Sequence, residues 1–176
     1  MENLDAIDIK LLKLLQDNSR LTTKELSQEV KLSISPVYER VKRLENDGFI
    51  DRYVALLNPE RLSLGFMAYV MVKLSKQSQQ YANDFISLVQ SIPEVTECYA
   101  LVGSYDYMMK IYAPDMKYYR NFVLEVLGGN EAIGSIESTF VMSEVKHTTM
   151  LPLRQIERKK LCGGFGVPDC LHSPDR

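Results

Sequence analysis

The chain has 176 residues, of which 45% are hydrophobic and 25% are charged. These fractions are typical of a folded globular protein and exclude a disordered or collagen-like chain. The net charge of −2 indicates no general preference for nucleic acid, so evidence for such a partner must come from the placement of the charges.

The sequence contains no apolar run near the ~18–20 residues that span a bilayer. Residues 1–5 are acidic, unlike the basic start of a signal peptide. We therefore expect a cytoplasmic protein with no membrane partner. The three cysteines, Cys98, Cys162 and Cys170, match no zinc or secreted disulfide pattern, which favours free thiols over a Cys162–Cys170 disulfide.

The first region, residues 1–57, begins with two predicted helices. Apolar residues recur at helical spacing from Ile7 to Leu15, which predicts an amphipathic helix. Thr22 stands three residues before Glu25, and this capping box predicts the start of a second helix.

A third helix is predicted to start near Ser35-Pro36. Serine is a good N-cap, and proline suits the first helical position because its missing N–H would have no partner there. Gly48 is a suitable left-handed stop. Residues 49–56 then have the pattern of a strand or a small wing.

This order of helices is a helix-turn-helix layout. Off the apolar stripe of the third helix lie Tyr38, Glu39, Arg40, Lys42 and Arg43, with three cations against one acid. Such a helix suits the major groove, where Arg and Lys contact bases and phosphates. The alternative is that these cations form only the solvated face of a small bundle, and helix spacing alone leaves both interpretations open.

The remaining chain divides into a linker, a second domain and a tail. Residues 58–65 form the predicted linker because Asn58-Pro59-Glu60 is a turn signal. Residues 66–153 alternate between strand and helix patterns, whereas residues 154–176 lose periodicity, and we assign this tail no function.

The second domain has the predicted order β-α-β-β-α-β. Predicted strands span residues 67–74, 95–102, 107–112 and 136–145, and predicted helices span residues 81–92 and 116–126. This order predicts an α+β fold, a ferredoxin-like sandwich with both helices on one face of an antiparallel sheet. Met71, Tyr99 and Met108 would leave the other face apolar, so we expect a second copy to cover it.

Four segments resemble the Lrp/AsnC family, the feast/famine transcription regulators. The run 32–50 looks like the family's recognition helix and its end, and residues 55–59 are similar to the strand before its linker. Residues 102–107 (VGSYDY) resemble its effector loop, and residues 141–146 its final strand. The resemblance spans residues 4–153 in the family's order and spacing.

The resemblance implies a DNA-binding transcriptional regulator with a winged helix-turn-helix and a ferredoxin-like effector domain. It implies no enzyme activity, metal or cofactor. Dimers would pair sheet to sheet and assemble into tetramers or octamers, with a small-molecule effector, usually an amino acid, bound between dimers. The candidate residues for contact with double-stranded DNA are Ser33, Ser35, Pro36, Tyr38, Arg40, Lys42 and Arg43.

The candidate effector residues are Gly103, Ser104, Tyr105, Asp106 and Thr139. Gly103 would let the backbone approach a ligand closely. The Asp106 carboxylate could accept hydrogen bonds from an α-ammonium group, and Thr139 could help to hold the ligand's carboxylate. The alternatives are that Asp106 caps its own turn and that Tyr105 packs across strands, as aromatic residues in hairpins usually do.

Three other classes of protein are weaker interpretations. An enzyme would need a catalytic set, but the two histidines, His147 and His172, form none with neighbouring residues. An RNA-recognition module would need an aromatic run that residues 107–112 lack. A purely allosteric amino-acid-binding subunit would have no use for the helix-turn-helix.

Overall fold

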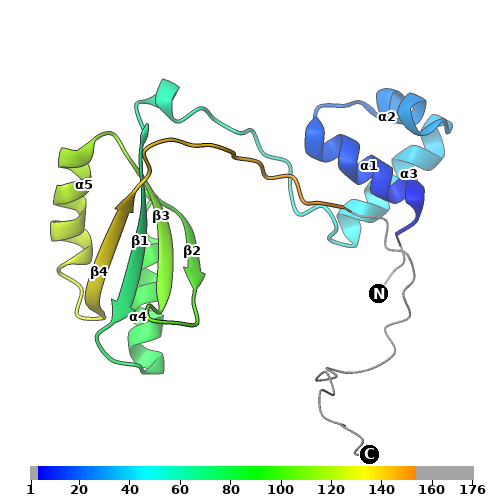
Figure 1. Ribbon diagram of the computed structural model, residues 1–176. Coiled ribbons are helices and arrows are strands. Elements are labelled where there is room, and N and C mark those ends of the chain that lie inside the picture. The colour runs from blue at the N-terminus through cyan, green and yellow to red at the C-terminus, as the bar shows by residue number, and fades with distance from the viewer. Residues whose placement is uncertain (1–3, 154–176) are drawn as a thin grey trace, which may run out of the picture. The chain divides into compact units, whose positions relative to one another are not determined.

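The computed structural model describes residues 4–153 in two compact units (Figure 1). The described part of the N-terminal unit comprises residues 4–54 and 148–153, and the C-terminal unit comprises residues 55–147. The tail, with Cys162, Cys170 and His172, lies outside the described residues.

The N-terminal unit is a three-helix bundle of α1 (Ala6–Asp17), α2 (Thr23–Val30) and α3 (Ile34–Asn46). The predicted capping box of α2 is confirmed, because the Thr22 and Glu25 side chains each accept from the other residue's backbone N–H. The three helices share an apolar core in which Leu11, Val37 and Leu44 are fully buried.

The third helix begins slightly earlier than the sequence predicted. Its N-cap is Ser33, which makes no capping hydrogen bond with its side chain, and Pro36 is the third helical residue. The turn before it is closed by Lys31, whose φ of 56° is left-handed. Gly48, with a φ of 75°, lies in the left-handed region as predicted.

The sequence pattern allows a strand or a small wing at residues 49–56, and of these two the strand does not form. These residues are irregular beyond a turn at 47–48, and Tyr53, Val54 and Leu56 are exposed. A strand requires a neighbouring strand for its backbone hydrogen bonds, and within residues 4–153 this segment has none.

The C-terminal unit contains the predicted ferredoxin-like sheet. Its strands are β1 (Phe66–Leu74), β2 (Val95–Ala100), β3 (Tyr107–Ala113) and β4 (Ile133–Phe140). They lie in the order β2-β3-β1-β4, and all neighbouring pairs are antiparallel. A short 3-10 helix, Glu60–Leu62, precedes β1. β4 ends at Phe140, so the prediction of a strand to residue 145 is wrong.

Two helical segments cover one face of this sheet (Figure 1). They are α4 (Gln79–Gln90) and α5 (Met116–Phe122), and α5 continues as a π-helical turn, Val123–Leu127. The predicted cap of α5 is confirmed, because Asp115 accepts a hydrogen bond of 2.7 Å from the Tyr118 N–H. Phe85 of α4 packs fully buried against the sheet.

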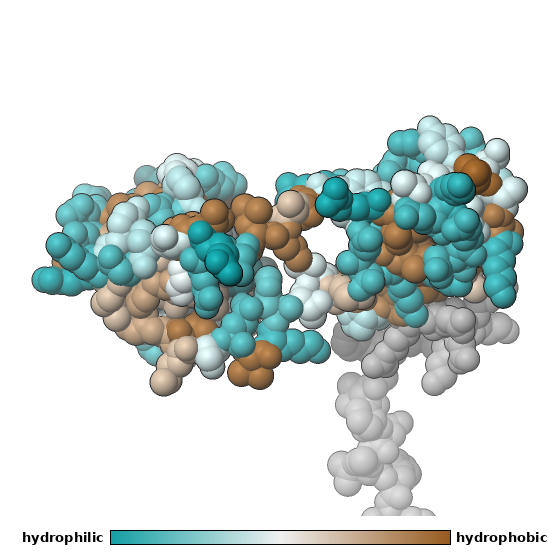
Figure 2. Space-filling view, turned by 90° about the horizontal axis from the view of Figure 1, so that it is seen from above, coloured by the Kyte–Doolittle hydropathy of each residue, from teal (hydrophilic) through white to brown (hydrophobic). Residues whose placement is uncertain are grey.

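The other face of the sheet carries the predicted apolar side chains. Met71 of β1 stands opposite Met108 of β3, and Tyr99 of β2 stands beside Met108. Tyr99 is half-exposed. Figure 2 shows hydrophobic residues interspersed with polar ones on the surface of the C-terminal unit.

The last described residues pack with the helices. Residues 148–153 belong to the N-terminal unit rather than to the sheet unit. The Leu151 N–H donates to Oε1 of Gln16 at 2.6 Å, and Leu153 packs against the helical core. The described end of the chain is therefore part of the helix-turn-helix unit.

Replacing Phe85 with Ala should lower the free energy of unfolding by about 3–5 kcal/mol, because it leaves a cavity between α4 and the sheet. Urea unfolding followed by circular dichroism measures this change. Ile86→Ala is the matched control, because Ile86 is the exposed neighbour on the same helix, and it should cost within about 0.5 kcal/mol. Equal effects of the two substitutions would contradict the packing described.

Candidate functional site

The third helix presents a continuous polar face to solvent. Val37 and Leu44 turn inward, whereas Ser35, Pro36 and Glu39 are exposed and Tyr38 is 49% exposed. Residues 35, 38, 39 and 42 share one side of the helix because they are spaced by three or four positions. This side is the candidate DNA-binding surface.

Two of the three predicted DNA-contacting cations bind to α1 instead of pointing away from the unit. Nη1 of Arg40 lies 2.7 Å from Oδ1 of Asp8 and 2.6 Å from Oδ2 of Asp5. Nη2 of Arg43 lies 2.6 Å from Oδ2 of Asp8. Since the Asp8 side chain is only 1% exposed, it is a buried anion held between two guanidinium groups.

These ion pairs alter the acidity of the groups involved. Hydrogen bonds to Asp8 and Asp5 raise the pKa of Arg40. Burial raises the pKa of Asp5, but hydrogen bonds from the Asp8 N–H and the Arg40 side chain outweigh it, so the pKa of Asp5 lies below its ordinary value. The charged forms of both residues are thus stabilised in the folded unit.

The third cation, Lys42, remains at the surface. It pairs with Glu45 at 2.8 Å, a hydrogen bond that raises the pKa of Lys42, and its Nζ lies 6.0 Å from the Tyr38 ring centroid. An exposed ion pair of this kind is worth little in water. Lys42 can therefore exchange Glu45 for a phosphate group at low cost.

Glu39 is a surface residue that the sequence-based candidate set omits. It lies on the same side of α3 as Ser35, four residues earlier. A carboxylate in the major groove can accept from the N4 amino group of cytosine. Its helical spacing from Ser35 is the signal in the sequence that indicates this position.

The predicted effector loop lies between β2 and β3, where Asp106 links three segments of backbone. Its Oδ2 accepts from the Leu74 N–H at 2.8 Å, and its own N–H donates to Val72 O at 2.9 Å. The Leu101 N–H donates to Asp106 O at 2.8 Å. Asp106 therefore caps the end of β1 rather than its own turn. Within residues 4–153 no hydrogen bond reaches its other carboxylate oxygen, Oδ1.

A cavity of about 460 Å³ adjoins Asp106, between the ends of β1 and β2 and the start of α4. Polar side chains from the β1–α4 connection share its wall with Asp106, and no sequence motif marked them. The residues that line it are Leu74, Gln77, Ser78, Gln79, Ala82, Ala100, Leu101, Asp106 and Tyr107.

The other four predicted effector residues do not line this cavity. Gly103 and Ser104 are exposed in the loop, and the Tyr105 hydroxyl donates to Glu137 of β4, which raises the pKa of Tyr105. Thr139 is exposed on β4 opposite Tyr69. Within one chain the structure thus does not bring the five residues to one site.

A helix-turn-helix joined to a ferredoxin-like domain with a polar-walled cavity defines the class of ligand-responsive DNA-binding regulators. Residues 4–51 match the winged helix-turn-helix DNA-binding profile, and residues 67–151 match the Lrp/AsnC ligand binding domain.

Known proteins place the chain within this class. It is 38% identical over 150 residues to the DNA-binding transcriptional activator DecR of Escherichia coli K12, which covers 85% of this chain and 99% of DecR. It is 37% identical to the leucine-responsive regulatory protein of the same organism, over 87% of this chain and 93% of that protein.

A solved structure has the same fold. The crystal structure of a Neisseria meningitidis transcriptional regulator in complex with L-Met is 42% identical, with a TM-score of 0.83, covering 85% of this chain and 97% of that chain. The protein belongs to the Lrp/AsnC family: it is a DNA-binding transcriptional regulator with a ligand-binding domain, and not an enzyme. Across residues 4–153, no helix combines the length and the apolar character that crossing a bilayer requires.

Replacing Asp8 with Asn should destabilise the N-terminal unit by about 2–3 kcal/mol. This is less than the ~3–5 kcal/mol for removing one partner of a fully buried pair, because both guanidinium groups can turn toward water. Hydrogen exchange read on α1 and α3 measures the loss within this unit.

Asp17→Asn is the control for this substitution, because Asp17 is exposed at the end of the same helix. It should leave exchange in α1 and α3 unchanged. Equal protection in the Asp8 variant and the parent protein would show that the ion pairs do not hold α3 in place.

Proposed function

We propose that this regulator binds double-stranded DNA through α3 and responds to an amino acid bound at the cavity beside Asp106. The observation that carries the effector assignment is the Asp106 carboxylate, which borders a cavity with one oxygen still available. The L-Met bound to the Neisseria regulator supports an amino acid as the ligand class.

At the DNA, the exposed residues of α3 make the contacts. Ser33, Ser35, Pro36 and Tyr38 enter the major groove and approach the bases, and Lys42 binds a phosphate. Arg40 and Arg43, tied to Asp8, primarily fix the angle of α3 and are secondary candidates for phosphate contact.

At the effector, the α-ammonium group of the amino acid donates to Oδ1 of Asp106. Within one chain, four predicted effector residues lie away from the cavity: Gly103, Ser104, Tyr105 and Thr139. In the assembled protein they contact the ligand either from a neighbouring dimer or after the loop has changed its position. This arrangement requires a homo-oligomer, built on dimers whose apolar sheet faces pair.

The two sites act on each other through assembly. A dimer presents two α3 helices to successive major grooves about 34–36 Å apart. An effector bound between dimers favours one assembly over another, by as much as its affinities for the two differ. We assign DNA binding to residues 1–57 and effector binding and assembly to the domain that begins at residue 66, and the DNA target implies action in the cytoplasm.

For DNA binding, Lys42→Ala should weaken the complex about equally for all sequences and reduce the slope of log affinity against log salt by about 1, because one phosphate contact is lost. Gel shifts on the promoter fragment of the protein's own gene, repeated at several salt concentrations, measure both quantities. Lys13→Ala, an exposed lysine of α1, should change neither. Loss of binding to one sequence only would contradict the phosphate role.

For effector binding, Asp106→Asn should lower amino-acid affinity tenfold or more, because a hydrogen bond to a charged group is worth about 1.5–3 kcal/mol. Asparagine retains an oxygen for the Leu74 N–H, so the hairpin is preserved. Gel shifts with split amino-acid pools identify the ligand, and calorimetry then measures its affinity.

Asp84→Asn, an exposed acid of α4, is the matched control and should leave effector affinity unchanged. Unchanged affinity in the Asp106 variant would reject the proposed pocket while leaving DNA binding untouched. Absence of any specific DNA complex across genomic fragments would contradict the DNA half of the proposal.

A further inference from the structure

Glu39 lies near the centre of the exposed side of α3, and the proposed function gives it no role. At about 100° per residue, Glu39 stands about 160° around the helix from Val37 and about 140° from Leu44. Both of those residues are fully buried in the helical unit. Ser35, four residues earlier, and Lys42, three residues later, flank Glu39 and are also exposed. Glu39 therefore points away from the bundle, toward whatever α3 binds.

The other acid of α3, Glu45, has a structural role. Its Oε2 pairs with Nζ of Lys42 at 2.8 Å, and its Oε1 accepts a hydrogen bond of 3.0 Å from the Tyr53 hydroxyl. Within residues 4–153, Glu39 has no such hydrogen bond or ion pair. The two acids of one helix thus differ: the structure uses one carboxylate and leaves the other in solvent.

The cations of α3 do not neutralise Glu39. Arg40 and Arg43 turn to Asp8 of α1, at 2.7 Å and 2.6 Å. Lys42 stands three positions from Glu39 but pairs with the acid on its other side. The side of α3 that faces DNA therefore presents a carboxylate.

A carboxylate at this place is unfavourable for general DNA binding. Double-stranded DNA carries one negative charge per about 1.7 Å of its axis, so an acid on the contact surface weakens binding to every sequence. An ionised carboxylate accepts hydrogen bonds and donates none. It regains the lost free energy only where the groove presents a hydrogen-bond donor.

Cytosine is the base whose major-groove edge best suits a carboxylate. Its N4 amino group is a donor, and the cytosine edge carries no acceptor beside it. Guanine presents the acceptors N7 and O6, and thymine presents the acceptor O4, so both repel a carboxylate. Adenine has a donor at N6, but its acceptor N7 lies next to it.

We propose that Glu39 determines base specificity by accepting a hydrogen bond from the N4 amino group of one cytosine in each half-site. This inference rests on the proposed function, in which α3 enters the major groove. Since a dimer presents two α3 helices, the two cytosines occupy symmetry-related positions. The repulsion of Glu39 by all other sequences widens the difference in affinity between specific and non-specific DNA.

The base preferences of the full-length protein test this proposal. Bound fragments are selected from a library of double-stranded DNA with a randomised central segment, and competition gel shifts then compare the four bases at each selected position. The parent protein should prefer cytosine to guanine and thymine by at least about fivefold at one position of each half-site.

Two substitutions assign this preference to Glu39. Glu39→Gln should shift it from cytosine toward adenine, because an amide accepts from N6 and donates to N7. Glu39→Ala should lose the cytosine preference and gain none for adenine. Both variants should bind non-specific DNA more tightly than the parent protein, because a negative charge is removed from the contact surface.

Glu29→Gln is the matched control, because it removes the same charge from an exposed residue of α2. It should keep the cytosine preference of the parent protein. Circular dichroism verifies that each variant is folded. Loss of the cytosine preference in both Glu39 variants but not in the Glu29 variant supports the proposal.

Unchanged base preferences in the Glu39 variants, with affinity raised equally for all sequences, would show that Glu39 is only a solvated charge and would overturn the proposal. A parent protein that forms no specific complex with any DNA would instead count against the proposed function itself. A specific complex that Lys42→Ala weakens, but whose base preferences Glu39→Gln leaves intact, would remove only the role assigned to Glu39.

Discussion

The position of the recognition helix depends on one buried carboxylate. Asp8 lies inside the helical unit, accepts from Arg40 and Arg43, and also caps the first turn of α1 through the Asp5 N–H. A buried carboxylate without such partners would lose its hydration and gain no interaction in return, which would cost several kcal/mol of folding free energy. The pairing therefore fixes α3 against α1, and the exposed side of α3 follows from it.

Asp106 has a comparable role in the C-terminal unit. Its backbone and one carboxylate oxygen tie the β2–β3 hairpin to the end of β1. The same bonds hold the carboxylate at the edge of the cavity and spare the other oxygen. A structural hydrogen bond and a proposed ligand contact are thus compatible, because a carboxylate has two oxygens with several lone pairs.

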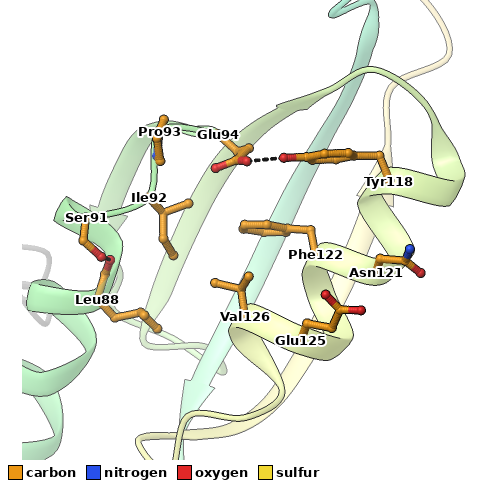
Figure 3. A pocket seen from close by; sticks show the side chains of 10 residues that line it. All are labelled: Leu88, Ser91, Ile92, Pro93, Glu94, Tyr118, Asn121, Phe122, Glu125 and Val126. Atoms are coloured by element: carbon orange, nitrogen blue, oxygen red, sulfur yellow. Dashed lines mark hydrogen bonds between the residues drawn. The ribbon is translucent and has the colours of Figure 1, made fainter.

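The ferredoxin-like unit offers two different kinds of surface. One face of the sheet is closed by α4 and α5, and a cavity of about 500 Å³ lies between the end of α4 and α5 (Figure 3). The other face leaves methionine and tyrosine side chains accessible around Lys110, which is buried and paired with Glu97 at 3.1 Å. The ion pair with Glu97 offsets the cost of burying the Lys110 charge within this surface.

The sequence by itself determined the order of the elements and most of their boundaries. The periodicity from Ile7 to Leu15, the Thr22–Glu25 capping box and the Asp115 cap act over a few residues, so their local physics is visible in the sequence. The βαββαβ order likewise left few alternatives to the observed sheet. No strand forms at residues 49–56, where the pattern allowed a strand or a small wing, and β4 does not continue after Phe140, because strand formation depends on a neighbour that periodicity does not reveal.

Tertiary structure decided the roles of the charged residues. Arg40 and Lys42 look equivalent in the helical pattern. Arg40 nevertheless binds Asp8 of α1, which is 32 residues away in the sequence, whereas Lys42 stays at the surface. The bond from the Leu74 N–H to Asp106 and the cavity between α4 and α5 also join segments that are distant in the chain. Local sequence sets which residues can carry charge, but packing between distant elements determines which of those charges remain free to bind.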